Sequence, residues 1–446
     1  MAVHLRARRS HRPMTPAQQT GKSALAADNV CKVGLIGFGT VGSAVVRLLY
    51  ARQDEHQLRL THILARNPQR KKVDWVPGEV RWTDSFEELL ASDVEVIVEL
   101  IGGLDPAHDW VRRALQAGKS VVTANKQLIA HRGSELIELA RSHKKHLAFG
   151  ACVAGGVPVL AGLHEGLAGD RLVKVSGILN GTCNYILTRI EQSGAAFADA
   201  VKEAQAAGFA EANPAEDVDG LDAGAKLVVL ARVGLNAEVT PKQVLCRTIR
   251  ELAHVDFDYA RDLGCTIRQV SRAELREGQV LATVEPALVP QNSRLASASG
   301  SHNLVISTGE FGGETVFAGH GAGGNPTAVA VVSDLLFIVR HRAAGVAELD
   351  RPAATAYEVS HDFETPHYLR FVVKDAPGII AALAGVLSRH HINIDAVFQR
   401  PGHEQVTLPF VITLESCKTS RAEAALAEMS QFSFLVQPPL RMPILR

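Results

Sequence analysis

Residues 30–49 read VCKVGLIGFGTVGSAVVRLL, an apolar stretch followed by three spaced glycines and a second apolar stretch. The first part is typical of a buried strand, and the second has the apolar periodicity of a helix. Between them, Gly37 permits a tight turn, Gly39 lets the backbone approach a pyrophosphate, and Gly42 lets helix and strand pack closely. The helix N-terminus attracts phosphates. This order of strand, glycine turn and helix predicts a dinucleotide-binding fold.

Strands and helices continue to alternate after the glycine turn. We expect strands at 58–65, 94–103 and 120–126, with a helix at about 106–117. This alternation predicts a doubly wound parallel sheet. Lys126 follows the carboxyl end of a strand, where open α/β sheets bind ligands, so it is placed to reach nicotinamide or substrate. The spacing alone is equally consistent with a surface lysine.

The end of the second strand indicates which dinucleotide binds. An acid at this point would bind the ribose 2′-hydroxyl of NAD, but the chain has Arg66, followed by Arg70, Lys71 and Lys72. Arginine suits the 2′-phosphate of NADP. We therefore predict NADP as the preferred cofactor, with NAD as the second choice. The alternative is that these cations only form a solvated helix face.

Length and composition narrow the class of protein. A chain of 446 residues has a prior of about three domains, and 47 basic against 47 acidic residues create no global field for nucleic acid or anionic membranes. Six dispersed cysteines without a C-x-x-C pair, and no apolar stretch long enough to span a bilayer, favour a cytoplasmic protein with reduced thiols. Residues 1–28 contain a single acid at their end and are expected to form a disordered basic tail, with a transit segment or a true start at Met14 as alternatives.

The loop at 208–227, GFAEANPAEDVDGLDAGAKL, is dense in carboxylates and leads into an apolar helix. Asp222 and Lys226 therefore lie one turn apart on the same helix face. This spacing places an ammonium beside a carboxylate and suggests a substrate site. By itself such a pair is more often a solvated salt bridge.

Several motifs together resemble homoserine dehydrogenase, in collinear order from about residue 31 to 340. They are GFGTVG at 37–42, ELIGG at 99–103, TANK at 123–126, VAGGVP at 153–158, NGTCNYIL at 180–187, the carboxylate loop, and GHGAGGNPTA at 319–328. Residues 368–380, YLRFVVKDAPGII, resemble the start of an ACT regulatory domain. The chain thus resembles the monofunctional type, because no aspartokinase-like region precedes the dehydrogenase.

This resemblance implies an α/β protein of three parts after the basic tail. We expect a Rossmann-type nucleotide-binding domain at 29–156, completed by about 319–345. An α+β substrate-binding and dimerisation domain should occupy 157–318, and a ferredoxin-like ACT domain 366–446. Strands at 279–284 and 303–308 and a helix at 256–263 are expected in the second part. The resemblance also implies a homodimer.

The reaction implied by the resemblance interconverts L-homoserine and L-aspartate 4-semialdehyde with NAD(P)H, in threonine and methionine biosynthesis. Lys226 matches the position of the general acid/base, and Lys126 would bind the reacting oxygen and contact the nicotinamide end. Glu211 and Asp222 match positions that bind the substrate ammonium and orient the lysine. Cofactor contacts are expected from Gly37, Phe38, Gly39, Thr40, Val41, Gly42 and Arg66.

The chain departs from the family pattern at three places near the predicted site. Gly150 replaces a usual glutamate, Asn213 replaces a usual aspartate, and 248–250 (Thr-Ile-Arg) replaces a common Glu-Gly-Ile. The family's glutamate joins main-chain carbonyls around a sodium ion, whose counterparts here are Val153, Gly155 and Val157. We expect sodium to bind more weakly, because hard cations prefer charged oxygen ligands. Asn213 predicts a weaker grip on the substrate ammonium.

The carboxyl-terminal module predicts a strand, an Asp-x-Pro-Gly turn, a helix at 379–390 and a strand at 392–397. Its turn is a candidate site for an amino-acid effector, with threonine expected, or a plain β-turn and dimer contact. Residues 413–415 (Thr-Leu-Glu) differ from the family's usual His-containing form. For the whole chain, the alternatives to an active enzyme are a regulatory homologue with weakened catalysis, or an enzyme for another amino-acid aldehyde.

Overall fold

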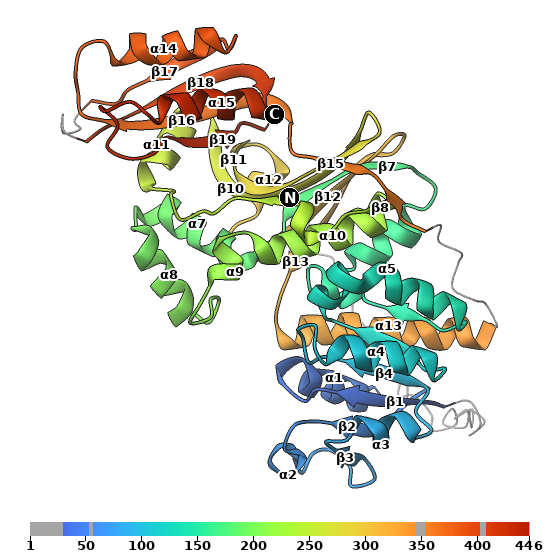
Figure 1. Ribbon diagram of the computed structural model, residues 1–446. Helices are drawn as coiled ribbons and strands as arrows, with labels where there is room; N and C mark the ends of the chain where they lie inside the picture. Colours follow the sequence, from blue (N-terminus) through green and yellow to red (C-terminus); the bar gives the residue numbers. More distant parts are fainter. Residues whose placement is uncertain (1–29, 53–56, 345–352, 402–406, 446) are drawn as a thin grey trace, which may run out of the picture.

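The computed structural model describes residues 30–52, 57–344, 353–401 and 407–445. The predicted basic tail at 1–28 lies outside these residues. Figure 1 shows three bodies in a row: an amino-terminal sheet with helices (blue), a central sheet with helices (green and yellow), and a carboxyl-terminal sheet with two helices (orange and red). No helix among the described residues combines the length and apolarity required to cross a membrane.

The amino-terminal body is built on a six-stranded parallel sheet in the order β3-β2-β1-β4-β5-β6. Its strands are β1 (Cys31–Ile36), β2 (Leu58–Leu64), β3 (Arg81–Thr83), β4 (Val96–Glu99), β5 (Ser120–Thr123) and β6 (Leu147–Ala148). The associated helices are α1 (Thr40–Ala51), α2 (Pro68–Lys71), α3 (Phe86–Ala91), α4 (Ala107–Gln116) and α5 (Lys126–Ser142). The doubly wound prediction is confirmed. Because the strand order reverses direction at β1 and β4, the crevice at their carboxyl ends is the expected ligand position.

A helix from far along the chain completes this body. Helix α13 (Gly324–Ala344) lies beside α1, although nearly 300 residues separate them in sequence (Figure 1). Its buried Val331 and Leu335 join the same hydrophobic cluster as β1 and α1. The chain therefore returns to the nucleotide-binding body after the central one.

The central body is a mixed, mainly antiparallel sheet in the order β13-β12-β7-β10-β11-β15, with β9 also paired to β11. The strands are β7 (Leu172–Ile178), β9 (Leu245–Cys246), β10 (Cys265–Arg276), β11 (Gln279–Pro290), β12 (His302–Gly309), β13 (Gly313–His320) and β15 (Glu358–Ser360); β8 (Ala237–Glu238) pairs separately with β14 (Thr355–Ala356). The helices are α6 (Val159–Ala161), α7 (Gly181–Ser193), α8 (Phe197–Ala206), α9 (Ala215–Val218), α10 (Leu221–Gly234), α11 (His254–Asp262) and α12 (Arg294–Ser297). The predicted strands at 279–284 and 303–308 are present within β11 and β12, and the predicted helix at 256–263 corresponds to α11.

The carboxyl-terminal body alternates as β-α-β-β-α-β, with an antiparallel sheet in the order β17-β18-β16-β19. Its elements are β16 (Glu364–Val373), α14 (Ile379–Arg389), β17 (Ile394–Phe398), β18 (Leu408–Lys418), α15 (Thr419–Met429) and β19 (Leu440–Pro443). This is the predicted ferredoxin-like arrangement. Tyr368 and Arg370 on β16 both bind the carboxylate of Asp256 on α11, so buried polar contacts join this body to the central one.

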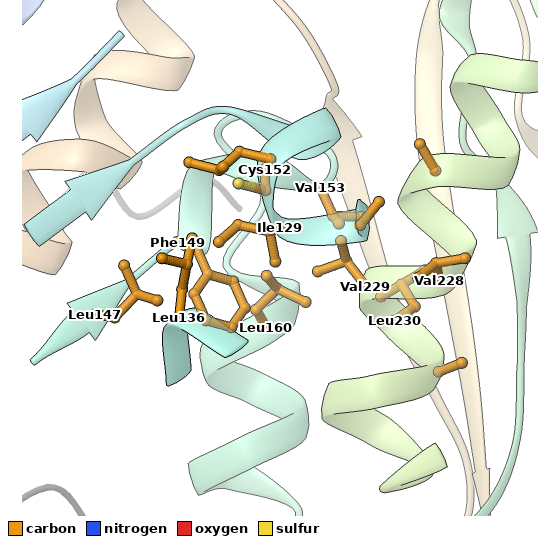
Figure 2. Close-up of a cluster of buried hydrophobic side chains, with 14 of the residues drawn as sticks. Ile129, Leu136, Leu147, Phe149, Cys152, Val153, Leu160, Val228, Val229 and Leu230 are labelled. Atoms are coloured by element: carbon orange, nitrogen blue, oxygen red, sulfur yellow. The ribbon is translucent and has the colours of Figure 1, made fainter. Parts of the chain in front are cut away.

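A shared hydrophobic core fixes the nucleotide-binding body against the central body. Figure 2 shows Ile129 and Leu136 of α5 in the same cluster as Val228, Val229 and Leu230 of α10. All five side chains are buried. Truncating one such leucine to alanine typically costs about 2–5 kcal/mol. The packing therefore holds α5 and α10 in a fixed relation, and both helices carry predicted site residues.

Candidate functional site

The glycine turn has the geometry that the sequence predicted. Gly37 has φ +98°, a backbone conformation that favours glycine. A Cβ on Gly42 would lie 2.1 Å from the carbonyl oxygen of Gly37, so only glycine lets α1 approach β1 this closely. A Cβ on Gly39 would meet nothing within 4 Å. The backbone at the start of α1 is therefore open to a bound phosphate.

The other predicted cofactor residues surround this turn. Thr40 and Val41 form the first turn of α1, and the Phe38 ring packs edge-on against Trp82, with ring centres 4.9 Å apart. Arg66 lies two residues after the end of β2, and its side chain is exposed. The cations after it lie on α2, a single turn, or just beyond it. Arg66 thus stands at the strand end where the adenosine ribose is expected.

One buried carboxylate lies between the two predicted lysines. Asp222 is 6% exposed; its Oδ1 lies 2.9 Å from Nζ of Lys126, and its Oδ2 lies 2.7 Å from Nζ of Lys226. Burial would raise the pKa of Asp222, but the charges of Lys226 and Lys126 outweigh it and hold that pKa well below its usual range. Asp222 is therefore an anion that positions two ammonium groups.

Two helices from different bodies of the fold, α5 and α10, supply the two lysines and the carboxylate. Asp222 and Lys226 are one turn apart on α10, as predicted. Lys126 is the first residue of α5, whose N-cap Asn125 accepts the Leu128 N–H at 3.1 Å. Burial opposes the charge on Lys126, but the negative charge of Asp222 outweighs it and raises the pKa of Lys126. The site thus depends on the α5–α10 packing described above.

Two further residues belong to this cluster, and the sequence analysis did not single them out. Asn180, the N-cap of α7, donates to Oδ2 of Asp222 at 2.8 Å and to Oδ1 of Asp217 at 2.6 Å. Burial raises the pKa of Asp217, which lies on the one-turn helix α9. Asn180 was quoted only within a motif, and Asp217 only within the carboxylate loop. An asparagine that precedes a helix start is a recognisable N-cap signal, but its second contact depends on the fold.

The structure does not bring Glu211 into contact with this cluster. Its side chain is exposed, and its carboxylate makes no hydrogen bond or ion pair with the described residues. Its main-chain carbonyl accepts the Gln205 side-chain N–H at 3.0 Å. Asn213, the departure in the same loop, accepts the Ala215 N–H at 3.3 Å, just before α9. Asn213 therefore has a local structural contact.

Known proteins share both the sequence pattern and the fold of this chain. Residues 37–150 match the family model "Homoserine dehydrogenase, NAD binding domain", residues 158–336 match "Homoserine dehydrogenase", and residues 367–433 match "ACT domain". The Bacillus subtilis homoserine dehydrogenase is 36% identical over 394 residues, covering 86% of this chain and 91% of that protein. The Pseudomonas aeruginosa homoserine dehydrogenase is 35% identical, covering 93% and 98%.

The chain belongs to the homoserine dehydrogenase family. A crystal structure of a homoserine dehydrogenase from Thiobacillus denitrificans has a TM-score of 0.86 and 31% identity, covering 93% of this chain and 98% of that one. A hyperthermophilic archaeal homoserine dehydrogenase in complex with NADPH has a TM-score of 0.61 and 25% identity, covering 73% and 99%. These matches confirm the family and the fold class that the motifs indicated.

The family assignment establishes the activity. The chain is an NAD(P)-dependent oxidoreductase that interconverts L-homoserine and L-aspartate 4-semialdehyde, a step of amino-acid biosynthesis. The relatives give no support to the alternative of a regulatory subunit without catalysis. The ACT domain implies binding of a small-molecule effector.

The departure at Gly150 has a counterpart elsewhere in the structure. The Gly150 N–H donates to Oδ2 of Asp334 on α13 at 2.8 Å, and a Cβ on Gly150 would lie 2.7 Å from Oδ1. Asp334 thus occupies the space that a side chain at 150 requires. Burial raises the pKa of this carboxyl to about 7. The acid at this point therefore comes from α13.

The residues that the resemblance implies as sodium ligands, Val153, Gly155 and Val157, follow Gly150 closely in the chain. The Val157 carbonyl accepts the Val159 N–H at 2.7 Å. The described part of the chain contains no group of three or more His, Cys, Asp or Glu that could hold a metal. Weaker sodium binding at these carbonyls stays an expectation, because hard cations prefer charged oxygen ligands.

Proposed function

We propose that the chain carries out its reaction at the cluster of Lys126, Lys226 and Asp222. The carrying observation is that one buried carboxylate binds both ammonium groups within 2.9 Å. Lys226 also donates to the Leu179 carbonyl at 2.8 Å. An ammonium has three N–H donors, so one donor of Lys226 remains to reach the reacting oxygen. We propose that Lys226 gives a proton to that oxygen in aldehyde reduction and takes it back in alcohol oxidation.

Lys126 has a supporting role in this proposal. Among the described residues, the Lys126 ammonium pairs with Asp222, so two of its N–H donors can bind and polarise the substrate oxygen. Asp222 orients both lysines through these two contacts. Because its oxygens already accept from Lys126, Lys226 and Asn180, we assign it orientation rather than a grip on the substrate ammonium.

The substrate ammonium requires another carboxylate. Asp217 accepts from Asn180 through Oδ1, which leaves Oδ2 for a ligand. Glu211, on the exposed loop before α9, remains the second candidate from the sequence pattern. We propose that Asp217 binds the ammonium through a charge-assisted hydrogen bond, with Glu211 as the alternative carboxylate.

The cofactor is proposed to be NADP, bound along the glycine turn from Gly37 to Gly42 with Phe38, Thr40 and Val41 beside it. The bound dinucleotide supplies or accepts a hydride. The main-chain N–H groups at the start of α1 bind its pyrophosphate, and the exposed Arg66 pairs with the 2′-phosphate. The related archaeal enzyme in complex with NADPH supports the choice of cofactor. NAD should serve as the weaker alternative.

The remaining assignments concern the assembly and its regulation. We propose the domain division 29–156 with 319–345, 157–318 and 366–446, supported by the three sheets. We also propose a cytoplasmic homodimer that binds threonine at the exposed 375–378 turn before α14. In the departing segment 413–415, Thr413 donates to Asp395 at 3.0 Å and is fully buried, so this segment contributes mainly to the module's interior.

Substitution of Lys226 tests the proposed chemistry. Lys226→Ala should lower kcat for L-homoserine oxidation by about 10²–10⁴, the range for loss of a general acid/base, while NADP binding is retained. Lys202→Ala is the matched control, because Lys202 pairs with Asp199 on an exposed helix face. Near-normal turnover of Lys226→Ala would rule out its proton-transfer role.

A further inference from the structure

Asp219, another carboxylate of the 208–227 loop, binds side chains outside the substrate cluster. Asp219 follows α9 and directly precedes Gly220, the N-cap of α10. Asp217 lies two residues before it, and Asp222 lies three residues after it. Asp219 therefore lies in the turn between Asp217, the proposed ligand of the substrate ammonium, and Asp222, which orients the lysines.

Two side chains from a distant segment bind Asp219. The Thr248 hydroxyl donates to Oδ1 at 2.8 Å. The Arg250 guanidinium donates from Nε to Oδ1 at 2.8 Å and from its terminal nitrogen to Oδ2 at 3.1 Å. We call these three residues the Asp219 clamp. The bidentate geometry fixes the direction of the carboxylate as well as its charge.

The segment that carries the clamp is anchored in the core. It follows β9, which pairs with β11, and the Arg247 N–H donates to the Val284 carbonyl at 2.8 Å. Ile249, between the two clamp residues, is fully buried, and its N–H donates to the Val218 carbonyl at 3.0 Å. Because the segment is held on both sides, it can restrain the turn between α9 and α10.

We propose that Thr248 and Arg250 are positioning residues of the active site, acting through Asp219. The clamp holds the turn between α9 and α10, so that Asp217 and Asp222 both keep their hydrogen bonds from the Asn180 side chain. This inference gives a role to 248–250, the segment that departs from the family's usual residues. It rests on the proposed roles of Asp217 and Asp222 in the reaction.

An ion pair on the neighbouring helix α11, outside the substrate cluster, provides a matched control. Arg261 pairs with Asp258 at 3.0 Å, one turn apart on α11, and its side chain is 53% exposed, close to the 45% of Arg250. Exposed pairs of this kind contribute little to stability. If Arg250→Gln changes the kinetics and Arg261→Gln does not, the effect is specific to the ion pair with Asp219 and does not follow from the loss of any surface ion pair.

The test measures KM for L-homoserine and KM for NADP of each full-length variant in L-homoserine oxidation. Arg250→Gln should raise KM for L-homoserine and lower kcat/KM by about tenfold, the lower end of the effect of outer-shell partners. KM for NADP should stay within about twofold, because the glycine turn lies in another body. Arg261→Gln should leave both constants unchanged. Equal changes in both constants, or equal behaviour of the two variants, would overturn the proposal.

A double-mutant cycle tests whether the effect passes through Asp219. Asp219→Asn should reproduce the loss of Arg250→Gln, and the double variant should be no worse than Asp219→Asn, because groups that act through one partner are not additive. Additive losses would refute the clamp. If Arg250→Gln does not fold, Thr248→Val makes the same test, with an unchanged homoserine KM as the contradicting result. Retained turnover in Lys226→Ala would mark failure of the proposed function itself, independently of the clamp.

Discussion

Replacement of Asp222 by asparagine removes the charge that holds the two lysines. Asp222→Asn keeps the size of the side chain but leaves the ammonium groups of Lys126 and Lys226 without their shared anion. Removing one partner of a buried ion pair costs about 3–5 kcal/mol. The side chain of Lys226 is 14% exposed and that of Lys126 is 35% exposed, so water offsets more of the loss at Lys126. We therefore expect a loss of stability of about 3 kcal/mol, mostly from Lys226.

Thermal unfolding and steady-state kinetics measure the two consequences of Asp222→Asn. At about 2–4 °C per kcal/mol for domains of this size, Tm should fall by roughly 10 °C. The kcat for L-homoserine oxidation should fall by about a hundredfold, because both lysines lose their orientation. The matched control is Asp199→Asn, whose partner Lys202 is exposed and whose loss should change Tm little. Equal Tm values for the two variants, or near-normal kcat in Asp222→Asn, would refute the role of Asp222 as the shared anion.

Three further predictions concern the cofactor, stability and regulation. Arg66→Ala should lower the NADP to NAD preference, measured as the ratio of kcat/KM values, and an unchanged ratio would remove the 2′-phosphate role. Burial, with the nearby Arg441 charge, lowers the pKa of His367 to about 4. As pH falls below about 6.5, the His367 side chain therefore binds a proton in the unfolded chain before it does so in the folded chain. Stability should therefore decline by up to about 3 kcal/mol between pH 6.5 and 4, and His367→Leu should flatten that decline in unfolding curves. Threonine should change activity or Tm in a saturable titration, and unchanged values of both would reject threonine as the effector.

The local features of the nucleotide-binding body could be predicted from sequence because each depends on adjacent residues. Gly37 and Gly42 illustrate this: a positive φ and a close approach of helix to strand leave glycine as the fitting residue. The pairing of Asp222 with Lys226 follows from helix periodicity in the same way. Where the determinant lies within one turn or one strand–helix unit, the sequence pattern is sufficient.

Contacts between distant segments could not be predicted in this way. Asp334 occupies the space beside Gly150 from 184 residues away, and Asn180 joins Asp217 and Asp222 only because α7, α9 and α10 converge. The motif also grouped Glu211 with Asp222, whereas the structure leaves the Glu211 carboxylate exposed. Each of these depends on tertiary packing, which a linear spacing does not encode.

The most direct test of the central claim follows oxidation of L-homoserine at 340 nm by the wild-type chain and by Lys226→Ala, with NADP and NAD in parallel. The wild type should turn over L-homoserine with NADP preferred. Lys226→Ala should lose at least about a hundredfold in turnover, with NADP binding intact. Comparable rates for the two proteins would contradict the two-lysine site, and preference for NAD would contradict the assignment of Arg66.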